Sequence, residues 1–234
     1  MNAITIKPRE ITINEIDFYK ENGYVVIRNL IPKEVLERVR KGYRKAVNGD
    51  YKPEAWAQTW KENNLLQLSS PVDHITELNN HKHIEPIVQS ARQLSGSQVD
   101  FWYDQLIYKP AGNPWETAWH QDASYWKKSL SPETPSLTAW LAVEDVDLDM
   151  GCMSFVPGSH KKGLMEHRDI SDNNPINGAL EAVSDFSSAV KAPLNAGDVS
   201  FHDKYTLHFT SGNFGKRDRC GLVHHMKFFD ELIV

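Results

Sequence analysis

Short alternating segments separated by turn residues dominate the chain from Gln98 onward, and they limit the folds open to it. Each segment mixes apolar and polar positions with the period of two that a half-buried strand requires. Turns rich in glycine and proline lie between them, such as residues 110–114 (PAGNP). Many short strands joined by such turns favour a sandwich or barrel over a parallel α/β sheet. The expected strands span residues 99–108, 117–122, 137–144, 152–157, 199–202, 206–209 and 219–229.

The first 97 residues carry mostly helical signals instead. Thr12 and Glu15 have the spacing of a capping box, which predicts a helix start. Two further helices are expected, one after Pro32 and one over residues 85–94, with a short β-branched strand at residues 24–27. We therefore expect a mainly β fold with flanking α-helices, in a single domain over residues 1–234 with a mostly helical part at 1–97 and a β core at 98–234.

Composition argues against several function classes. The chain has 234 residues, a formal net charge of −5 and no block of Lys or Arg, which disfavours a nucleic-acid or anionic-membrane surface. Its apolar runs are shorter than the roughly 20 residues of a membrane helix, and its start lacks the apolar core of a secretory signal. Two cysteines are too few for a disulfide framework or a CxxC zinc site. We expect a soluble, cytoplasmic protein that acts on a small molecule, with no nucleic-acid or membrane partner.

His120 and Asp122 form the strongest local candidate for a metal site. In a strand, residues i and i+2 point to the same face, so the imidazole and the carboxylate emerge side by side. With a second histidine from elsewhere they make the facial triad of non-haem Fe(II) oxygenases, which leaves coordination positions open. Nitrogen and oxygen donors without thiolate suit iron better than a structural zinc ion. A bare His-x-Asp is common, so a surface pair is the ordinary alternative.

Two other His-x-acid pairs compete with this one. His167 and Asp169 fall in residues 165–194, a polar stretch with neither strand nor helix period that we expect to be a long loop or lid. His83 and Glu85 flank an expected helix start, where side chains two apart diverge by about 200°. Among the other histidines, we expect His81 and His83 to be exposed, at most one of His224 and His225 to face the barrel interior, and His74, His160, His167 and His202 to lack a partner at ligand spacing.

The second histidine and a basic residue come much later in the chain. His208 ends an expected strand far beyond Asp122, and this separation allows the intervening strands that a jelly roll needs to bring distant strand ends together. Arg219 opens the last expected strand. A guanidinium binds a carboxylate bidentately and stays charged, so an arginine inside the barrel would call for a dicarboxylate ligand. A solvated arginine in the charged run of residues 216–219 is the alternative.

These residues stand in a longer pattern that resembles the phytanoyl-CoA dioxygenase family of Fe(II)- and 2-oxoglutarate-dependent oxygenases. WHQD followed by GCMSFVPGSH is far more specific than either motif alone. The resemblance implies a jelly roll, the cupin-like double-stranded β-helix, for the β core. It spans nearly the whole chain and rests on residues 18–27 (FYKENGYVVI), 105–110 (QLIYKP), 119–122 (WHQD), 138–142 (TAWLA), 151–160 (GCMSFVPGSH) and the stretch from His208 to Arg219.

The resemblance also implies a set of site residues. It makes Arg219 the residue that holds the distal carboxylate of the co-substrate 2-oxoglutarate. Thr210, Gln105 and Trp140 match positions that touch the co-substrate in the family. The implied iron ligands are His120, Asp122 and His208.

The implied reaction uses Fe(II), 2-oxoglutarate and O2 and hydroxylates an unactivated C–H bond of a small molecule, giving succinate and CO2. Related halogenases have a small residue at the position of Asp122, so a carboxylate there favours hydroxylation. Desaturation, cyclisation and epimerisation at the same site stay open. So do a non-catalytic jelly roll, which predicts an incomplete triad or a lost arginine, and a zinc hydrolase, which would want a general base near the metal.

Substrate contacts are expected from Tyr125 and Trp126, just past the HQD motif. A pocket walled by aromatic rings suits an apolar or ring-containing substrate. Residues 51–72 and 165–194 are the segments expected to set specificity. The sequence is equally compatible with a free small molecule, a coenzyme A thioester and a carrier-bound chain, and with any oligomeric state.

Overall fold

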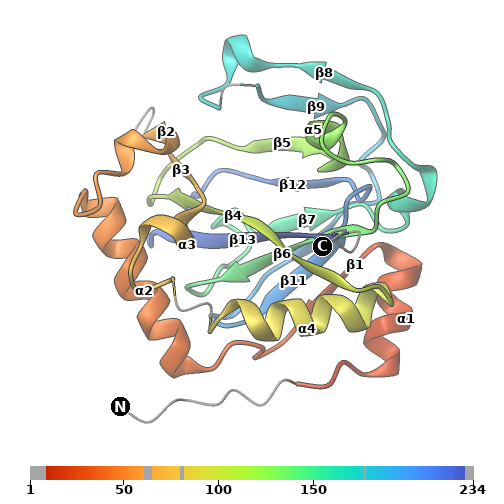
Figure 1. The fold of residues 1–234 in the computed structure, drawn as a ribbon. Coiled ribbons are helices and arrows are strands. Elements are labelled where there is room, and N and C mark those ends of the chain that lie inside the picture. Colours follow the sequence, from red (N-terminus) through yellow and green to blue (C-terminus); the bar gives the residue numbers. More distant parts are fainter. Residues whose placement is uncertain (1–8, 61–64, 80–81, 177, 230–234) are drawn as a thin grey trace.

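Two antiparallel sheets form the centre of the protein (Figure 1). The computed structural model describes residues 9–60, 65–79, 82–176 and 178–229. Within these residues the larger sheet has seven strands in the order β1-β11-β6-β13-β4-β3-β2, and the smaller has four in the order β10-β7-β12-β5. Neighbouring strands are mostly distant in sequence, as the jelly-roll prediction requires. The expected mainly β fold with flanking helices is therefore confirmed.

The strand bounds follow the order of each sheet. The larger sheet contains β1 (Tyr24–Ile27), β11 (Val199–Asp203), β6 (Ser136–Ala142), β13 (Arg219–Phe228), β4 (Val99–Lys109), β3 (Leu66–Ser69) and β2 (Ala57–Trp60). The smaller sheet contains β10 (Val190–Ala192), β7 (Met153–Phe155), β12 (His208–Thr210) and β5 (Thr117–His120). A separate pair, β8 (His167–Asp169) and β9 (Leu180–Ala182), lies next to β5 (Figure 1).

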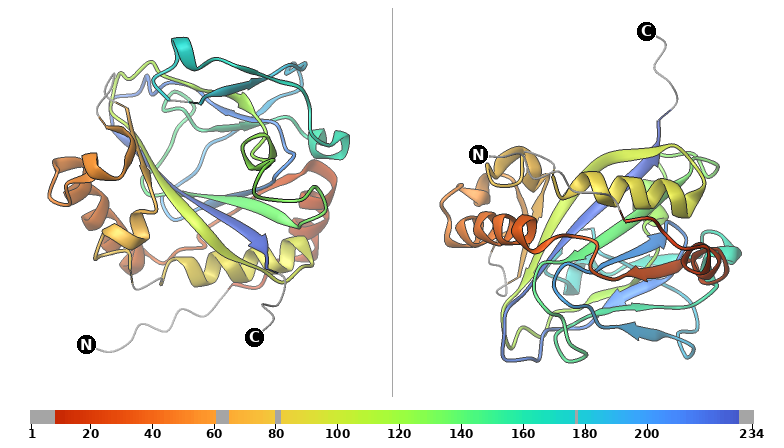
Figure 2. Two further views of the ribbon diagram at one scale, coloured as in Figure 1. Left: turned by 45° about the horizontal axis from the view of Figure 1, so that its top comes forward. Right: turned by 90° about the horizontal axis from the view of Figure 1, so that it is seen from below.

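The larger helices cover the outer face of the larger sheet (Figure 2). They are α1 (Ile13–Asn22), α2 (Lys33–Asn48) and α4 (Ile84–Ser95), joined by the short α3 (Pro71–His74). Apolar residues of α2 and α4 form one buried cluster with those of β6, β11 and β13. Short 3-10 turns occur at Pro53–Ala55, Ser159–Lys162 and Ser171–Asn173. Within the described ranges, none of the helices combines the length and apolarity needed to cross a bilayer.

Side chains alternate across β13 and divide it between two environments. Leu222 and Met226 pack in the cluster under the helices, whereas Val223 and His225 line a cavity between the two sheets. This is the period of two expected for a strand with both faces covered. The alternation places an apolar cluster on one face of the sheet and the functional side chains on the other.

The expected helix start at Thr12 is confirmed. The Glu15 amide donates to the Thr12 hydroxyl oxygen at 3.3 Å, while the Glu15 carboxylate accepts from the Thr12 amide at 2.8 Å. Reciprocal bonds of this kind satisfy donors that a helix start leaves unpaired. Gly23 ends α1 with φ +79°, a conformation that glycine adopts at little cost.

Three expectations about local structure are wrong. The strand expected at residues 117–122 ends at His120, and Asp122 has helical angles (φ −56°, ψ −37°) at the start of α5 (Ala123–Trp126). The stretch 165–194 contains β8, β9 and β10 rather than a loop alone. The first 97 residues supply three strands of the larger sheet, two of which, β2 and β3, lack the β-branched run that marked β1.

Candidate metal centre and active-site cavity

Three residues with metal-binding side chains meet at one point between the sheets. His120 ends β5, Asp122 starts α5 and His208 starts β12, and the two histidines are direct partners across β5 and β12. Asp122 Oδ1 lies 3.8 Å from His120 Nε2 and 3.6 Å from His208 Nε2. All three side chains are buried, and one donor atom of each lies within 4.8 Å of the others. Since metal–ligand bonds are about 2.0–2.2 Å long, this spacing suits one ion among the three atoms.

Backbone carbonyls fix the orientation of both imidazoles. His120 Nδ1 lies 2.7 Å from the Ala118 carbonyl oxygen, and His208 Nδ1 lies 2.9 Å from that of Thr206. A carbonyl oxygen only accepts, so Nδ1 carries the proton in each ring and the Nε2 lone pair faces Asp122. Partners of this kind hold the tautomer and the ring direction of metal-ligating histidines.

Burial and charge put the three groups in their ligand forms. Burial lowers the pKa of His120, and it holds the pKa of His208 well below its usual range, so both rings are neutral near pH 7. Burial opposes the charged form of Asp122, but the imidazoles of His208 and His202 outweigh it and hold the pKa of that carboxyl well below its usual range. A neutral imidazole pair and a carboxylate are the forms that bind a divalent metal.

The second carboxylate oxygen of Asp122 accepts hydrogen bonds from two other side chains. Oδ2 accepts from the Thr138 hydroxyl at 2.5 Å and from His202 Nε2 at 3.2 Å. Thr138 and His202 are direct partners across β6 and β11, so the larger sheet holds this oxygen from behind. Oδ1 is therefore the oxygen that faces the two imidazoles. His202, expected to lack a partner at ligand spacing, is not part of the metal cluster and instead hydrogen-bonds Asp122 from a distant part of the chain.

Arg219 is buried with unpaired donors. It is 1% exposed, and Nη2 donates to the Gly151 carbonyl oxygen at 2.9 Å, whereas Nε and Nη1 have no partner among the described residues. Its guanidinium lies over the Trp140 ring, 4.7 Å from the centroid. Gly221 makes room for this indole, because a Cβ there would lie 2.2 Å from Trp140 Cζ2. Burial lowers the pKa of Arg219 to about 10, so it is still protonated near pH 7.

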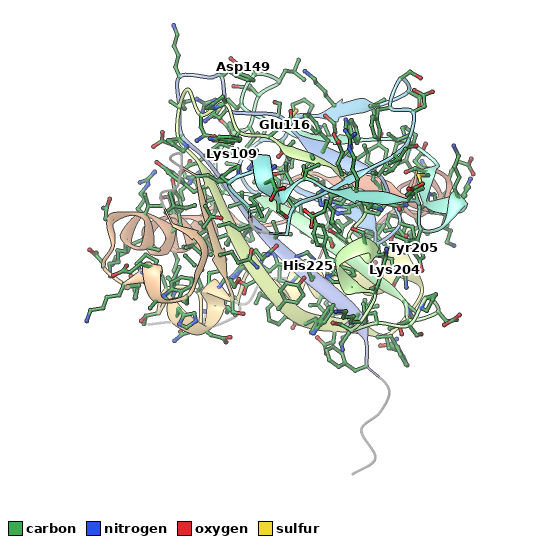
Figure 3. The ribbon with its side chains drawn as sticks, turned by 90° about the horizontal axis from the view of Figure 1, so that it is seen from above. Lys109, Glu116, Asp149, Lys204, Tyr205 and His225 are labelled. Atoms are coloured by element: carbon green, nitrogen blue, oxygen red, sulfur yellow. The ribbon has the colours of Figure 1, made fainter. Side chains whose placement is uncertain are left out.

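A buried lysine that the sequence did not single out lies beside this arginine. Lys109 is the direct partner of Arg219 across β4 and β13 and is fully buried. Its Nζ donates to the Thr210 hydroxyl and to the Ser211 carbonyl oxygen, each at 3.0 Å. Burial and the neighbouring Arg219 hold the pKa of Lys109 well below its usual range, while Glu116, labelled close to it in Figure 3, acts in the opposite direction.

The three metal-binding residues, Arg219 and Trp140 line one cavity of about 530 Å³ between the sheets. Trp126 is buried and donates from Nε1 to the Tyr103 hydroxyl at 2.9 Å, while the Tyr125 hydroxyl accepts from the Leu180 amide at 3.0 Å. The structure brings together all nine expected site residues on its wall: His120, Asp122, His208, Arg219, Thr210, Gln105, Trp140, Tyr125 and Trp126.

The other histidines separate into inward and outward groups. His225 lines the cavity, with Nδ1 3.0 Å from Thr138 Oγ1, whereas His224 faces away from it (Figure 3 labels His225). His83, expected to be exposed, is 1% exposed and packs edge-to-face on His224, because the outer face of the sheet is covered by α4. His167 accepts at Nε2 from the Gln121 amide and is not part of the metal cluster. His81 lies outside the described residues.

The residues present fit an iron ion and a 2-oxoglutarate molecule. Two imidazoles and one carboxylate oxygen on one side of an open cavity are the donor set of a non-haem Fe(II) site. The unpaired Nε and Nη1 of Arg219 are donors that an anionic carboxylate would satisfy. Fold and site together define a jelly-roll protein with an open three-donor metal centre beside an anion-binding arginine.

Comparison with known proteins places the chain within this class. The family model described as Phytanoyl-CoA dioxygenase (PhyH) matches residues 19–221. The chain therefore belongs to the phytanoyl-CoA dioxygenase family. It is a 2-oxoglutarate-dependent non-haem iron oxygenase, and Fe(II), 2-oxoglutarate and O2 are the cofactors of that family.

Individual relatives are distant in sequence. Human peroxisomal phytanoyl-CoA dioxygenase is 23% identical over 242 residues, which cover 97% of this chain and 71% of the human protein. EvdO2 from Micromonospora carbonacea var. aurantiaca complexed with 2-oxoglutarate has a TM-score of 0.78 at 20% identity, with 97% of this chain and 96% of that one covered. SnoK, a non-haem alpha-ketoglutarate-dependent carbocyclase from nogalamycin biosynthesis, has a TM-score of 0.73 at 24% identity, with 94% and 87% covered. At these identities, the likeness to the two solved structures shows the fold.

Proposed function

We propose that this protein hydroxylates an unactivated C–H bond of a small molecule, with conversion of 2-oxoglutarate and O2 to succinate and CO2. The observation that carries the proposal is the arrangement of Asp122 Oδ1 and two histidine Nε2 atoms around one point, in the same cavity as the unpaired donors of Arg219. We also propose that residues 1–234 form a single domain. A cytoplasmic location is proposed as well, and it agrees with the two free, buried cysteines, Cys152 and Cys220.

His120, Asp122 and His208 are the proposed iron ligands. When bound there, iron with 2-oxoglutarate and O2 supplies the oxidising chemistry that removes a hydrogen atom from the substrate and returns a hydroxyl group. The protein contributes the ligand geometry: two carbonyl-bound imidazoles, and a carboxylate held at its other oxygen by Thr138 and His202. Three protein ligands leave coordination positions open for the small molecules.

Arg219 is the proposed anchor of 2-oxoglutarate. Its guanidinium, which has donors unpaired among the described residues, binds the distal carboxylate. The Thr210 hydroxyl accepts from Lys109, and the guanidinium lies over the Trp140 ring. Gln105 is proposed to contact the co-substrate as well. A co-substrate fixed at its distal end presents its keto acid end to the metal in one orientation, which reduces the orientational cost of the reaction.

Tyr125 and Trp126 are the proposed substrate contacts. Their hydroxyl and indole N–H groups are already bonded to Leu180 and Tyr103, so they offer mainly ring faces to the cavity. Ring faces on the cavity wall would hold a substrate carbon against the metal and exclude bulk water. The complete triad and the buried Arg219 disfavour the non-catalytic alternative.

Turnover of 2-oxoglutarate tests the proposed function. The purified protein with Fe(II), and with ascorbate as reductant in place of a substrate, should release succinate from 2-oxoglutarate under air. His120→Ala, Asp122→Ala and His208→Ala should abolish this release. His74→Ala is a matched control, since His74 lies in α3 and stacks on Trp56 away from the cavity. Succinate release that persists in the three ligand variants would contradict the proposal.

The mass and isotope content of the product distinguish the possible types of oxidation. Hydroxylation adds one oxygen atom, and with 18O2 the product should gain the heavy isotope. Cyclisation is the second candidate, because SnoK, which shares the fold, is described as a carbocyclase. A product that loses two hydrogens would indicate cyclisation or desaturation, and one of unchanged mass would indicate epimerisation.

A further inference from the structure

A row of glutamine side chains crosses one end of the cavity. Gln58, Gln67 and Gln105 come from β2, β3 and β4, which are neighbouring strands at the edge of the larger sheet. All three line the cavity that holds the proposed iron site. Gln67 is 9% exposed, Gln105 is half-buried and Gln58 is exposed, so the amides extend from the interior to the mouth.

The strand register aims Gln58 toward the other two. β2 and β3 pair Ala57 with Leu68 but Thr59 with Gln67, so Gln58 is the extra residue of a β-bulge. A bulge redirects a side chain that regular pairing would send elsewhere, and such bulges are common beside active sites. The Gln105 amide donates from Nε2 to Gln58 Oε1 at 3.1 Å, which leaves Nε2 of Gln58 as a donor.

Gln67 has an unsatisfied amide oxygen. Its Oε1 is buried and has no hydrogen-bond partner in the described part of the chain. A buried acceptor left unpaired is destabilising, and native proteins rarely keep one without a reason. Rotation about the terminal bond exchanges the amide oxygen and nitrogen, so this group can present either an acceptor or a donor to a molecule in the cavity.

The cavity offers little charge to a substrate. Among its described lining residues, Asp122 is the only carboxylate and Arg219 the only guanidinium, and no lysine is present. Both are engaged by the proposed iron and 2-oxoglutarate sites. Phosphate and carboxylate groups are usually bound by arginine or lysine, so a charged substrate group would find no partner there. Uncharged amides suit uncharged hydroxyl groups, which donate and accept at once.

We propose that Gln58 and Gln67 form a substrate subsite for an uncharged, hydroxyl-bearing molecule, such as a glycoside or a hydroxylated ring system. The inference rests on the proposed function, because it takes the metal and Arg219 to be used by iron and 2-oxoglutarate. The glutamines bind substrate hydroxyl groups, while Tyr125 and Trp126 contact the apolar faces of the ring. The same subsite disfavours an acyl coenzyme A thioester, whose nucleotide carries several phosphate charges.

Binding of simple probes to the Mn(II)- and 2-oxoglutarate-loaded protein tests this subsite. Electron paramagnetic resonance of Mn(II) and a 2-oxoglutarate titration first establish that both are bound. Protein that binds neither would contradict the proposed function, whereas loaded protein that binds no probe would contradict only the subsite. Paramagnetic relaxation of probe protons then reports binding near the metal. The probes are methyl glucoside, the carboxylate methyl glucuronide, the hydroxyl-free ring tetrahydropyran, and hexanoyl-CoA.

Methyl glucoside should bind at least about tenfold more tightly than each of the other three probes. Gln67→Leu should remove its preference over tetrahydropyran without changing the 2-oxoglutarate affinity. Gln98→Leu is the matched control, since Gln98 is exposed between α4 and β4, and it should bind all probes as the wild type does. If Gln67→Leu loses its melting transition, Gln58→Leu carries the same comparison.

Three results would overturn the proposal. One is absence of relaxation by methyl glucoside in protein that holds both Mn(II) and 2-oxoglutarate. Another is equal or tighter binding of methyl glucuronide, tetrahydropyran or hexanoyl-CoA. The last is a folded glutamine variant that keeps the wild-type preference for the hydroxylated ring.

Discussion

The ammonium nitrogen of Lys109 lies 3.0 Å from the hydroxyl oxygen of Thr210, and both side chains are buried, although their strands, β4 and β12, belong to different sheets. Because the lysine donates, the Thr210 hydroxyl is left with its own proton to donate, and Thr210 lines the cavity. Lys109 therefore orients a donor toward the place where Arg219 is proposed to hold the distal carboxylate of 2-oxoglutarate.

Lys109→Met should raise the KM for 2-oxoglutarate by about tenfold and change kcat less, since it removes the bond that orients Thr210. Thr210→Val should have a similar effect, and the double variant should be little worse than either one, because the two residues act as a unit. Steady-state kinetics at varied 2-oxoglutarate checks this. Lys128→Met, at an exposed position, is the control. Additive effects of the two substitutions would contradict the positioning role.

Arg219→Met should raise the 2-oxoglutarate requirement more strongly than any other single change outside the triad. It removes a bidentate, charge-assisted contact worth on the order of 2–5 kcal/mol, so binding should weaken at least about thirtyfold. Direct titration with 2-oxoglutarate measures the loss. Arg217→Met is a close control, because Arg217 is exposed and pairs with Asp147 at the surface. A normal affinity in Arg219→Met would place the co-substrate elsewhere.

His202→Ala should weaken iron binding although His202 is not a proposed ligand. The ring donates to Oδ2 of Asp122, and loss of such an outer contact typically costs about 10–100-fold in metal affinity. Fe(II) titration under anaerobic conditions gives the affinity. His202→Gln, which can still donate, should recover part of the loss, whereas a purely structural role predicts equal damage from both substitutions.

Asp104→Asn should change how stability depends on pH. Burial raises the pKa of Asp104 to about 7, and its carboxylate oxygens have no partner among the described side chains. Since this folded-state pKa lies above the unfolded value near 4, the folded protein holds the proton more tightly between those values. The contribution of Asp104 to stability is therefore present at low pH and is lost as the pH rises from about 4 to about 7.

The asparagine variant has no proton to lose, so it should be more stable than the wild type at pH 8, by on the order of a few kcal/mol, and this difference should shrink toward pH 5. Urea unfolding at several pH values measures it. Asp100→Asn, in the same strand but exposed, should show no such trend. A pH-independent difference for Asp104→Asn would show that the buried carboxyl is not the cause.

The sequence could predict the parts of this molecule that depend on local pattern. β13 and β4 are long enough to show alternation, and the Thr12 capping box is contiguous. It did not predict β8, β9 and β10, because residues 165–194 are polar and show neither a strand nor a helix period. The sequence did not predict the helical turn at Asp122, because an aspartate after a short strand can either continue the strand or start a helix.

The nine expected site residues line one cavity, but the residues behind them were not found. Thr138 and His202 contact Asp122, and Lys109 contacts Thr210, from strands of the larger sheet that are distant in sequence. A single sequence does not display such contacts. Lys109 stood within the QLIYKP segment, yet a lysine in a strand is ordinarily solvated. The sequence alone does not show that Lys109 is fully buried or that it lies opposite Arg219 where β4 pairs with β13.

A crystal structure of the protein grown without oxygen, with Fe(II) and 2-oxoglutarate, would show directly which side chains bind the metal and the co-substrate. We expect iron bound by His120 Nε2, Asp122 Oδ1 and His208 Nε2, two further positions taken by the keto acid end of 2-oxoglutarate, and the distal carboxylate on Arg219. A metal enclosed by four protein ligands, or 2-oxoglutarate away from Arg219, would contradict this expectation.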